Sequence, residues 1–583
     1  MREPVQIVEM DVDYCSLSYG TGNCTAVLGT TGVRKCYNMF RHCQDQENFD
    51  KTTLTLRFAQ PRANMPMDQV YFPCLDVATP RSSTVNIGGA DNRFDALGKR
   101  ATVTVRLNDF AYDDFVLDKY QPQRVSGVAQ TDEGGYNPRD RGTFFRKLKT
   151  RWPYYAGRSL RVIDAYIEGG TLVQAKTRHF VMTEMAMDDS GRVTISGKDV
   201  LNLAENKRAT CPAQSTGVLV LPISDSATTA TLTPAGIGDL EYPANGKVAI
   251  GSEIVAFTRS GDVMTLTRGQ NNTAATSHNE SDAVQLCYEV NRARLDDTVR
   301  GLLVDYAGID AAFIPMTDWQ AEVTRWASGL ELSTLIPKPE GVAGLVGELA
   351  VLGVNIWWDD VAQEIRLKMI RPPDGDTVFD VTDDTAIKSA EIEDRDEDRL
   401  TRVAFFSAQI NPTKSVTSAD NFRQQYLYID LLSESDLQYN GSLTRSIYCR
   451  WLNTGDDINV RIAALRLLLR LKDAPQRLKM RLDAKDADIG LTDVLNVNSG
   501  VYSDETGAAR TQLMQVVSIA DHRSGHDFDI VAQNYAYSGQ YIYIAPDDAP
   551  DYSDATDAEK AAYWYFSDGD NNFPDNRKPY EII

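Results

Sequence analysis

The sequence predicts a multidomain α+β fold in which β-structure predominates, and three observations lead to this prediction. The chain has 583 residues, which corresponds to about four domains at roughly 150 residues per domain. Apolar and polar residues alternate with a period of two in stretches such as 52–58 and 101–107, as in half-buried antiparallel strands. Between residues 294 and 373 the apolar spacing changes to three and four, which is typical of helices. We therefore expect two barrel-like β-domains, an inserted small β-domain and an α/β unit that links them.

The first barrel-like domain is expected at residues 51–206. A turn rich in glycine and asparagine is expected at 88–92. A short helix is expected within residues 142–158, where Pro153 ends it because proline cannot continue a helix. A further strand at 160–167 follows this helix.

The next two units differ in their periodicity. Residues 207–290 are expected to form the inserted β-domain, with short strands at 253–257 and 263–267. The polar loop at 267–278 is interpreted either as a contact for sugars or a partner protein, or as an ordinary solvent loop. Residues 291–376, with helical spacing followed by two strands, are expected to form the α/β unit.

The last part of the chain is expected to contain the second barrel-like domain, at residues 377–544. An amphipathic helix is predicted at 458–472, with acidic residues at its start and a lysine at its end, which suits the helix dipole. Strands are predicted at 402–406, 425–429, 477–483, 494–497, 513–518 and 528–534. Residues 545–583 are acidic and carry four consecutive aromatic residues at 563–566, so we expect an extended arm that packs on a partner chain.

Composition excludes several classes of protein. Lys and Arg total 60 and Asp and Glu total 82, which gives a net charge of −22. A duplex-DNA reader needs basic patches, so this charge argues against one. The hydrophobic content of 42% is enough for several cores, which excludes global disorder. No apolar run approaches the ~20 residues of a membrane span, and we expect no signal peptide and synthesis in a cytoplasm.

No catalytic motif is visible, so we expect a protein that is not an enzyme. Only five histidines occur, which disfavours chemistry based on histidine. Glycine-rich phosphate loops, G-x-S-x-G and H-E-x-x-H are all missing from the sequence. Acidic runs at 359–360, 383–384 and 391–398 are expected to be solvated faces in a chain this acidic.

The cysteines give the sharpest local signal. Four of the eight lie in the first 43 residues, with the spacing C-x8-C-x11-C-x6-C: Cys15, Cys24, Cys36 and Cys43. We call these four the cysteine quartet. The others are scattered and are expected to be small core residues: Cys74, Cys211, Cys287 and Cys449. Clustered thiols in a reducing cytosol favour a metal site over disulfides.

The spacing of the quartet bears on which metal it would bind. Structural zinc sites usually contain C-x2–4-C pairs, and none is present. If residues 35–44 are helical, Cys36 and Cys43 lie about 10.5 Å apart along the helix axis. Sulfurs around one zinc ion lie within roughly 4 Å of each other, whereas a cubane iron–sulfur cluster is wider. These points favour an iron–sulfur cluster, and zinc, two disulfides or unrelated cysteines stay open.

The quartet also resembles a known module. The pairs Cys15-x8-Cys24 and Cys36-x6-Cys43, with the Gln-Asp-Gln-Glu-Asn-Phe that follows, are similar to the iron–sulfur module of siphophage tail-tip proteins. That module closes the tail-tip protein L of phage lambda, and related hub proteins occur in gene transfer agents and contractile tails. Here the loop between the pairs is shorter, and the module opens the chain. The resemblance implies that residues 1–50 bind a 4Fe–4S cluster through all four cysteines, with zinc as the alternative.

The resemblance further implies a structural role in a virion. Proteins of this kind are baseplate or tail-tip hubs, whose two barrel domains resemble tail-tube subunits. As a homotrimer, such a hub joins the six-fold tail tube or distal tail ring to a three-fold tip. The implied partners are distal tail, tube, tape measure and tail fibre or central tip proteins, and DNA passes the lumen without specific binding. Such a protein is assembled in the host bacterial cytoplasm and resides at the tail tip; the alternative is a tail adhesin that binds or degrades carbohydrate through residues 207–290.

Overall fold

The computed structural model describes residues 3–27, 36–86, 97–112 and 142–534, apart from a few single positions, together with 550, 553, 554 and 556. The positions left out within the last long range are 372, 374, 385, 436, 437, 439, 474, 487, 504, 505 and 524–526. The turn expected at 88–92 and nearly all of the expected arm at 545–583 lie outside the described residues. Within them strands predominate over helices, which confirms the predicted fold class.

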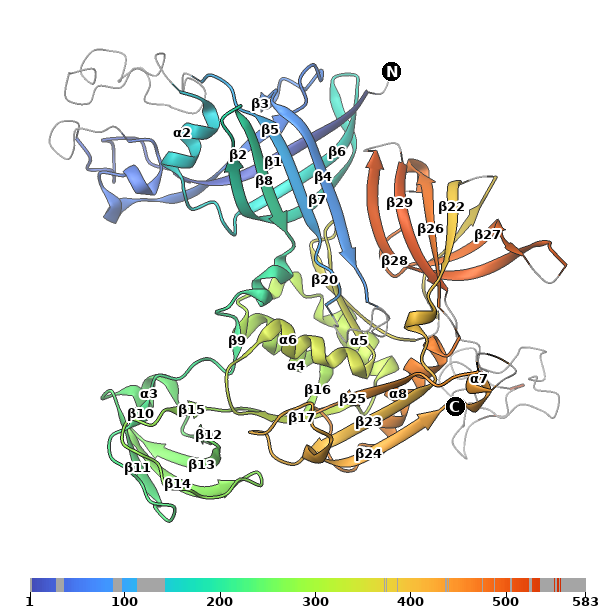
Figure 1. Cartoon of the computed structure of the whole chain (residues 1–583). Helices are drawn as coiled ribbons and strands as arrows, with labels where there is room; N and C mark the ends of the chain where they lie inside the picture. The colour runs from blue at the N-terminus through green and yellow to red at the C-terminus, as the bar shows by residue number, and fades with distance from the viewer. Residues whose placement is uncertain are drawn as a thin grey trace.

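The first barrel-like sheet is formed mainly by the amino-terminal third of the chain (Figure 1). Its strands are β1 (Glu3–Cys15), β2 (Lys51–Ala59), β3 (Tyr71–Phe72), β4 (Leu75–Thr84), β5 (Thr102–Asn108), β6 (Ser159–Glu168), β7 (Thr171–Met187) and β8 (Arg192–Lys198). They follow the order β4-β5-β8-β7-β6-β1-β2-β3. The alternation in β5 works as expected, because Val103, Val105 and Leu107 are buried and the residues between them are not.

Strand β1 is an inner strand of this sheet. It pairs antiparallel with β2 on one side and with β6 on the other, so that Val8 faces both Phe58 and Val162. Residues 3–15 therefore lie with the strands of 51–206, and the segment 16–50 is a connection between two neighbouring strands. Helix α2 (Phe144–Arg151), expected within 142–158, packs its aromatic side against the same sheet.

The inserted unit forms a sheet and a core of its own. Its strands are β10 (Val218–Leu219), β11 (Thr229–Thr233), β12 (Asn245–Ile250), β13 (Glu253–Ser260), β14 (Val263–Gln270) and β15 (Val284–Leu286), with helix α3 (Ile237–Glu241). The sheet order is β10-β11-β14-β13-β12-β15. Strands predicted at 253–257 and 263–267 correspond to β13 and β14.

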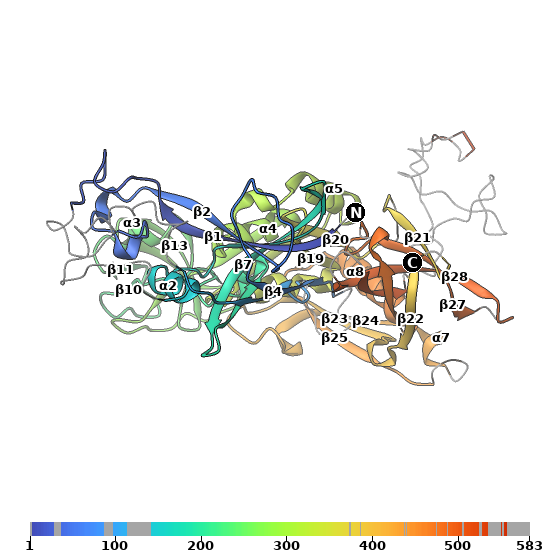
Figure 2. The same cartoon turned by 90° about the horizontal axis from the view of Figure 1, so that it is seen from above.

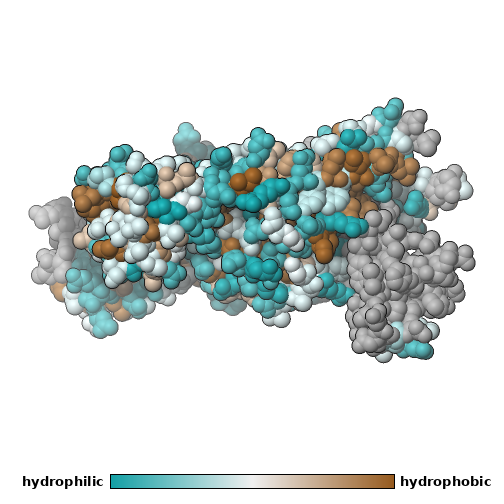
Figure 3. Space-filling model, turned by 90° about the horizontal axis from the view of Figure 1, so that it is seen from below, coloured by the Kyte–Doolittle hydropathy of each residue, from teal (hydrophilic) through white to brown (hydrophobic). Residues whose placement is uncertain are grey.

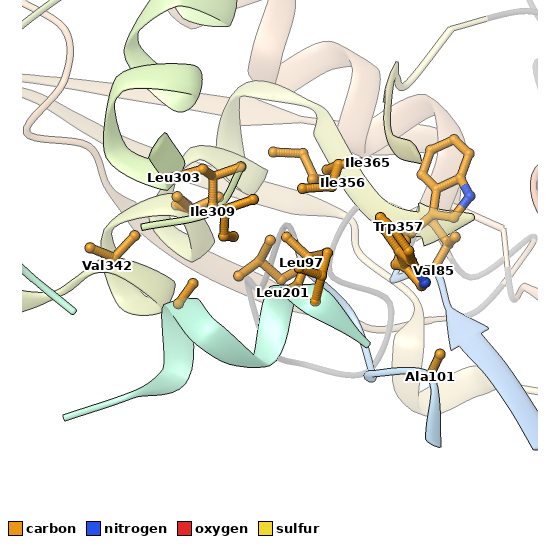
Figure 4. Packing of buried hydrophobic residues seen from close by; sticks show 14 of the residues in the cluster. Val85, Leu97, Ala101, Leu201, Leu303, Ile309, Val342, Ile356, Trp357 and Ile365 are labelled. Atoms are coloured by element: carbon orange, nitrogen blue, oxygen red, sulfur yellow. The ribbon is translucent and has the colours of Figure 1, made fainter. Parts of the chain in front are cut away.

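The α/β unit occupies the centre of the molecule. Its elements are β9 (Thr210–Cys211), β16 (Tyr288–Arg294), α4 (Leu295–Gly301), α5 (Met316–Trp326), β17 (Glu331–Ile336), β18 (Glu340–Gly341), α6 (Val342–Glu348), β19 (Val354–Asp359) and β20 (Glu364–Met369). Figure 4 shows side chains of this unit, such as Leu303 and Ile356, packed with Leu97 and Leu201 from the first domain. One continuous hydrophobic core therefore joins the first sheet to the centre.

The second barrel-like sheet comes from the carboxy-terminal part of the chain. Its strands are β21 (Val378–Thr382), β22 (Ile387–Asp394), β26 (Gln476–Asp483), β27 (Val494–Ser503), β28 (Ala509–Arg523) and β29 (Asp527–Asn534). Strand β28 also pairs with β4, with Ser518 opposite Thr84, so that both barrel-like sheets belong to one sheet, which has 14 strands within the described residues. Figure 2 shows an elongated molecule with the blue strands β1 and β2 toward one end and the red strands β27 and β28 toward the other.

The strands predicted at 402–406 and 425–429 do not belong to this second sheet. They lie in β23 (Arg402–Gln409) and β24 (Phe422–Ile429), which form a separate three-stranded sheet with β25 (Thr444–Tyr448). Short helix α7 (Leu431–Glu434) follows β24, and helix α8 (Asp457–Leu471), predicted at 458–472, packs against β23. Val403 and Phe405 join the central core, which explains why this sheet separates from the barrel. None of the helices in the described part is both long and apolar enough to cross a membrane.

Candidate metal centre at the amino-terminal cysteines

The cysteine quartet lies at one end of the first sheet. Cys15 is the last residue of β1, where it pairs with Lys51, the first residue of β2. Cys24, Cys36 and Cys43 lie in the connection between these two strands. Cys15 is buried and the other three are half-buried, and all four are free thiols. A connection that starts and ends on paired strands brings its two ends together, and this places the first cysteine next to the segment that holds the others.

The four thiols are close enough to affect one another electrostatically. Burial is the main reason that the pKa of Cys36 is raised to about 11, and the other three thiols of the quartet contribute to this rise. Burial likewise raises the pKa of Cys43, to which the thiols of Cys15 and Cys24 add. The four predicted residues are therefore near enough for the charges of their thiolates to interact.

Backbone N–H groups point at sulfur within this cluster. The N–H of Gly20 donates to Cys24 Sγ at 3.4 Å, and the N–H of Asn38 donates to Cys36 Sγ at 3.2 Å. Gly20 has a φ of +66°, and a Cβ there would lie 3.0 Å from the carbonyl oxygen of Ala26. Glycine therefore suits this close turn better than any other residue. Such donors stabilise the charge of a thiolate that binds a metal.

The argument against zinc assumed a helix over residues 35–44, and this helix is not formed. Between Cys36 and Cys43 the chain has only the 3-10 turn η1 (Phe40–His42). Asn38 has a left-handed φ of 58° and interrupts any longer helix. The axial separation calculated for a helix over residues 35–44 was therefore wrong, and it no longer distinguishes iron–sulfur from zinc.

Asn38 links the segment to the end of β1. Its side chain is almost fully buried and donates to the carbonyl oxygens of Cys15 at 3.3 Å and Leu17 at 3.5 Å. Its carbonyl oxygen accepts a hydrogen bond from the N–H of Cys15 at 2.8 Å. These bonds fix the stretch around Cys36 against the stretch around Cys15.

Two further contacts hold the segment in place. The carboxylate of Asp45 accepts hydrogen bonds from the N–H of Thr25 at 2.7 Å and from its hydroxyl at 2.9 Å, which ties the part near Cys24 to the part near Cys43. The guanidinium of Arg151, on α2, lies 4.1 Å from the ring centre of Tyr37. The first contact joins two parts of the cysteine segment, and the second joins the segment to helix α2 of the first domain.

The donor set suits a soft metal centre. Four thiols are the usual ligands of a 4Fe–4S cluster and also one of the ligand sets of structural zinc. In the described residues no group of three or more His, Cys, Asp or Glu side chains is arranged so that it could hold a metal ion. Sequence reasoning found the four thiols but missed Asn38 and Asp45, since a single asparagine or aspartate carries no recognisable spacing.

The other cysteines lie apart from the quartet. Cys74, Cys211 and Cys449 are buried and Cys287 is half-buried. Burial raises the pKa of each of these thiols to about 12, as expected for small side chains in apolar surroundings.

The polar loop at 267–278 is exposed over most of its length but is fixed at two points. Its His278 is buried and its Nε2 lies 2.8 Å from Glu253 Oε2. The side-chain amide of Asn272 donates to the carbonyl oxygen of Ile410 at 2.8 Å. The loop therefore contacts the connection between β23 and β24 of the same chain.

Comparison with known proteins gives distant similarities in structure. No protein-family profile and no curated protein matches the chain. Its structure is similar to a tail protein from Neisseria meningitidis MC58, at 9% identity over 78% of this chain and 91% of that one, with a TM-score of 0.37. It is also similar to the prophage MuSo2 43 kDa tail protein from Shewanella oneidensis, at 9% identity over 79% and 94%, with a TM-score of 0.35. A chain in the virion of a native gene transfer agent particle matches at 12% identity over 65% and 78%, with a TM-score of 0.26.

Proposed function

We propose that this chain is a structural virion protein, the tail-tip or baseplate hub of a long-tailed phage, and that its cysteine quartet binds a 4Fe–4S cluster. The observation that supports the proposal is the position of the four cysteines at the end of β1 and in the connection to β2, with N–H donors directed at the sulfurs of Cys24 and Cys36. The spacing of these cysteines is the feature that resembles siphophage tail-tip proteins.

The cluster would have a structural role. In the described residues of the segment between β1 and β2, 16–27 and 36–50, the helical elements are the short turns η1 and η2 (Gln46–Asn48), and neither turn contributes a fully buried side chain. A segment with so little core of its own gains stability from a bound metal centre, because binding free energy then becomes folding free energy. The residues that would hold the cluster are the four thiols, and Asn38 and Gly20 would place N–H groups next to the bound sulfur.

The arrangement of sheets supports a hub role. Two barrel-like sheets in one chain, joined through β28 and β4, offer two related surfaces per subunit. A trimer of such chains presents six barrels, which matches a six-fold tube on one side and a three-fold tip on the other. The net charge of −22 would repel DNA phosphates and let a genome pass without specific binding.

The metal is tested by analysis of protein purified without oxygen. We expect a brown protein with absorbance near ~400 nm and both iron and sulfide bound. Cys24→Ser and Cys43→Ser should each lose this absorbance and most of the iron. Cys287→Ser, which changes a half-buried thiol in the inserted domain, is the matched control and should retain both. If the purified protein contains zinc and no iron, the quartet binds zinc, and the 4Fe–4S proposal is wrong.

The location is tested separately, by mass spectrometry and averaged images of purified particles that contain the chain. We expect the chain in the particle at the tail tip in three copies or a multiple of three. A protein that is found free in the cell and never in particles would contradict the hub proposal, whatever metal it holds.

A further inference from the structure

A large cleft lies where three units of the chain meet. Its walls come from the β6–β7 hairpin of the first sheet, from the β19–β20 hairpin of the α/β unit, and from β22, β26, β28 and β29 of the second sheet. Its volume is about 1420 Å³. Sites for small molecules measure roughly 300–1,000 Å³, so this cleft has room for a segment of another polypeptide. We call it the junction cleft.

Carboxylates outnumber cationic groups in the junction cleft. Among the described residues, seven aspartates line it against five lysines and arginines. Lys388 already forms an ion pair with Asp483, at 3.0 Å. Asp488 and Asp493 form no ion pair with any described residue. The cleft therefore has carboxylates in excess, and it favours a cationic occupant over an anionic one.

One carboxyl group of the cleft is almost fully buried and lacks a donor. Asp360 is 6% exposed, and its Oδ2 accepts no hydrogen bond from a described residue. The Nε of Arg178 lies 3.8 Å from this oxygen, beyond hydrogen-bond distance. Burial raises the pKa of Asp360, while Arg178 opposes this rise and Asp359 adds to it. A buried carboxyl oxygen without a donor costs free energy, so a ligand that supplies a charged N–H group gains by binding there.

A second carboxyl group and an indole ring belong to the same cleft. Burial raises the pKa of Asp493, while the hydrogen bond from the N–H of Gly490, at 2.7 Å, opposes this rise. Asp359 adds to the rise at Asp493, as it does at Asp360, so these three carboxyl groups interact. Trp357, on β19, also lines the cleft. Carboxylates beside an indole suit a guanidinium group, whose edge donates hydrogen bonds and whose face packs on aromatic rings.

The net charge of −22 attracts basic partners to the whole molecule but does not select a site. Figure 3 shows teal, hydrophilic side chains spread along the face seen from below and not gathered in one place. The junction cleft differs from such a surface because it combines volume, a buried oxygen without a donor and an aromatic ring. These features give the site its specificity, and the net charge adds only general attraction.

We propose that the junction cleft binds an arginine-containing segment of a partner polypeptide, with the guanidinium group donating to Asp360 and packing near Trp357. Arginine fits better than lysine because its planar group bonds carboxylates in pairs and is more weakly hydrated. The proposal is independent of the metal centre and of the hub role.

Binding of a fluorescein-labelled hexa-arginine peptide to the full chain tests the proposal. Fluorescence anisotropy at ~0.15 M salt measures the affinity and limits long-range attraction. The double variant Asp360→Asn with Asp493→Asn should bind at least ~10-fold more weakly, because it loses charge-assisted hydrogen bonds. Asp189→Asn with Asp225→Asn removes the same charge from exposed loops and should bind within about two-fold of the wild type. Equal weakening by the two double variants, or no binding to the wild type, would overturn the proposal.

Hydrogen exchange of the wild type locates the bound peptide without any substitution. On addition of hexa-arginine, the residues of the cleft at 357–366 and 488–493 should exchange more slowly, whereas β11 and β14 of the inserted domain should not change. Hexa-lysine carries the same charge and should protect the cleft less at equal concentration. Protection outside the cleft alone would overturn the site, and equal protection by the two peptides would overturn the preference for arginine.

Discussion

Asn38 is the residue on which the geometry of the cysteine segment depends most. It combines a left-handed backbone with two side-chain hydrogen bonds and an N–H directed at the sulfur of Cys36. Asparagine tolerates this backbone better than most residues because its short polar side chain bonds locally. A helix over residues 35–44 entered the zinc argument only as a condition, and the left-handed backbone of Asn38 could not be predicted, because the backbone angle of one residue in a loop leaves no periodic signal.

This role gives a prediction for two variants. Asn38→Ala should lower the free energy of unfolding by roughly 1–3 kcal/mol, because it loses two hydrogen bonds and strains a left-handed position. Asn38→Gly removes the same bonds without the strain and should lose less. Urea unfolding of the two variants beside the wild type measures the difference. Equal losses would show that the backbone conformation contributes nothing.

Glu253 is a second residue whose environment determines its behaviour. Its fully buried carboxylate accepts two hydrogen bonds from the guanidinium of Arg268, at 2.9 and 2.7 Å, and others from the N–H groups of Gly269 and Thr276. Burial raises the pKa of this carboxyl, but the hydrogen bonds, above all from Arg268, outweigh burial and lower it to about 2. The charged form is therefore the one that stabilises the inserted domain.

The pH dependence follows from the sign of this shift. Because the pKa is lower in the folded state than its usual 4.5, the stabilisation is complete above pH 4.5 and is lost as the pH falls toward 2. Glu253→Gln should destabilise the domain at pH 7 by about 3–5 kcal/mol, since it leaves the buried positive charge of Arg268 without its carboxylate partner. It should also remove this acid dependence. Thermal unfolding at several pH values is the measurement, and exposed Glu280→Gln should change stability by less than about 0.5 kcal/mol.

At the scale of elements, helix α8 shows which sequence signals are sufficient to predict a helix and its two ends. Its apolar spacing and terminal charges predicted residues 458–472, and the structure has Asp457–Leu471. Strands with period two, such as β5, β13 and β26, were predicted equally well, because alternation states directly which face is buried. The placement of β23 and β24 in the second barrel-like domain was wrong. Periodicity predicts that a strand exists, but it does not predict which strand it pairs with.

The two faces of α8 give a matched pair of variants. Leu467 is fully buried between α8 and the central core, whereas Ile458 on the first turn is 74% exposed. Leu467→Ala should cost about 2–5 kcal/mol of unfolding free energy because it leaves a cavity. Ile458→Ala should cost less than about 0.5 kcal/mol. Denaturant unfolding measures both, and similar losses at the two positions would contradict the observed burial.

At the scale of the whole molecule, the contacts that join the two barrel-like sheets could not be predicted from the sequence. Ser518 and Thr84 are 434 positions apart, and yet their hydroxyls lie 3.3 Å from each other where β28 meets β4. The N–H of Val85 also donates to the carbonyl oxygen of Val517 at 2.9 Å. No local sequence pattern predicts such a pairing, because the backbone edge of one strand can pair with many other strands. Class and composition were accessible from the sequence, and the junction of the two sheets was not.

The cysteine quartet is relevant at all three scales. Its four residues lie at the end of β1 and in the connection to β2, and the proposed role in a virion depends on the metal that they bind. The most direct test is the ratio of iron and acid-labile sulfide to protein in the full chain purified without oxygen. Our account predicts about four iron and four sulfide per chain, both lost in Cys36→Ser. A protein that contains neither, with its amino-terminal cysteines paired as disulfides, would contradict the central claim.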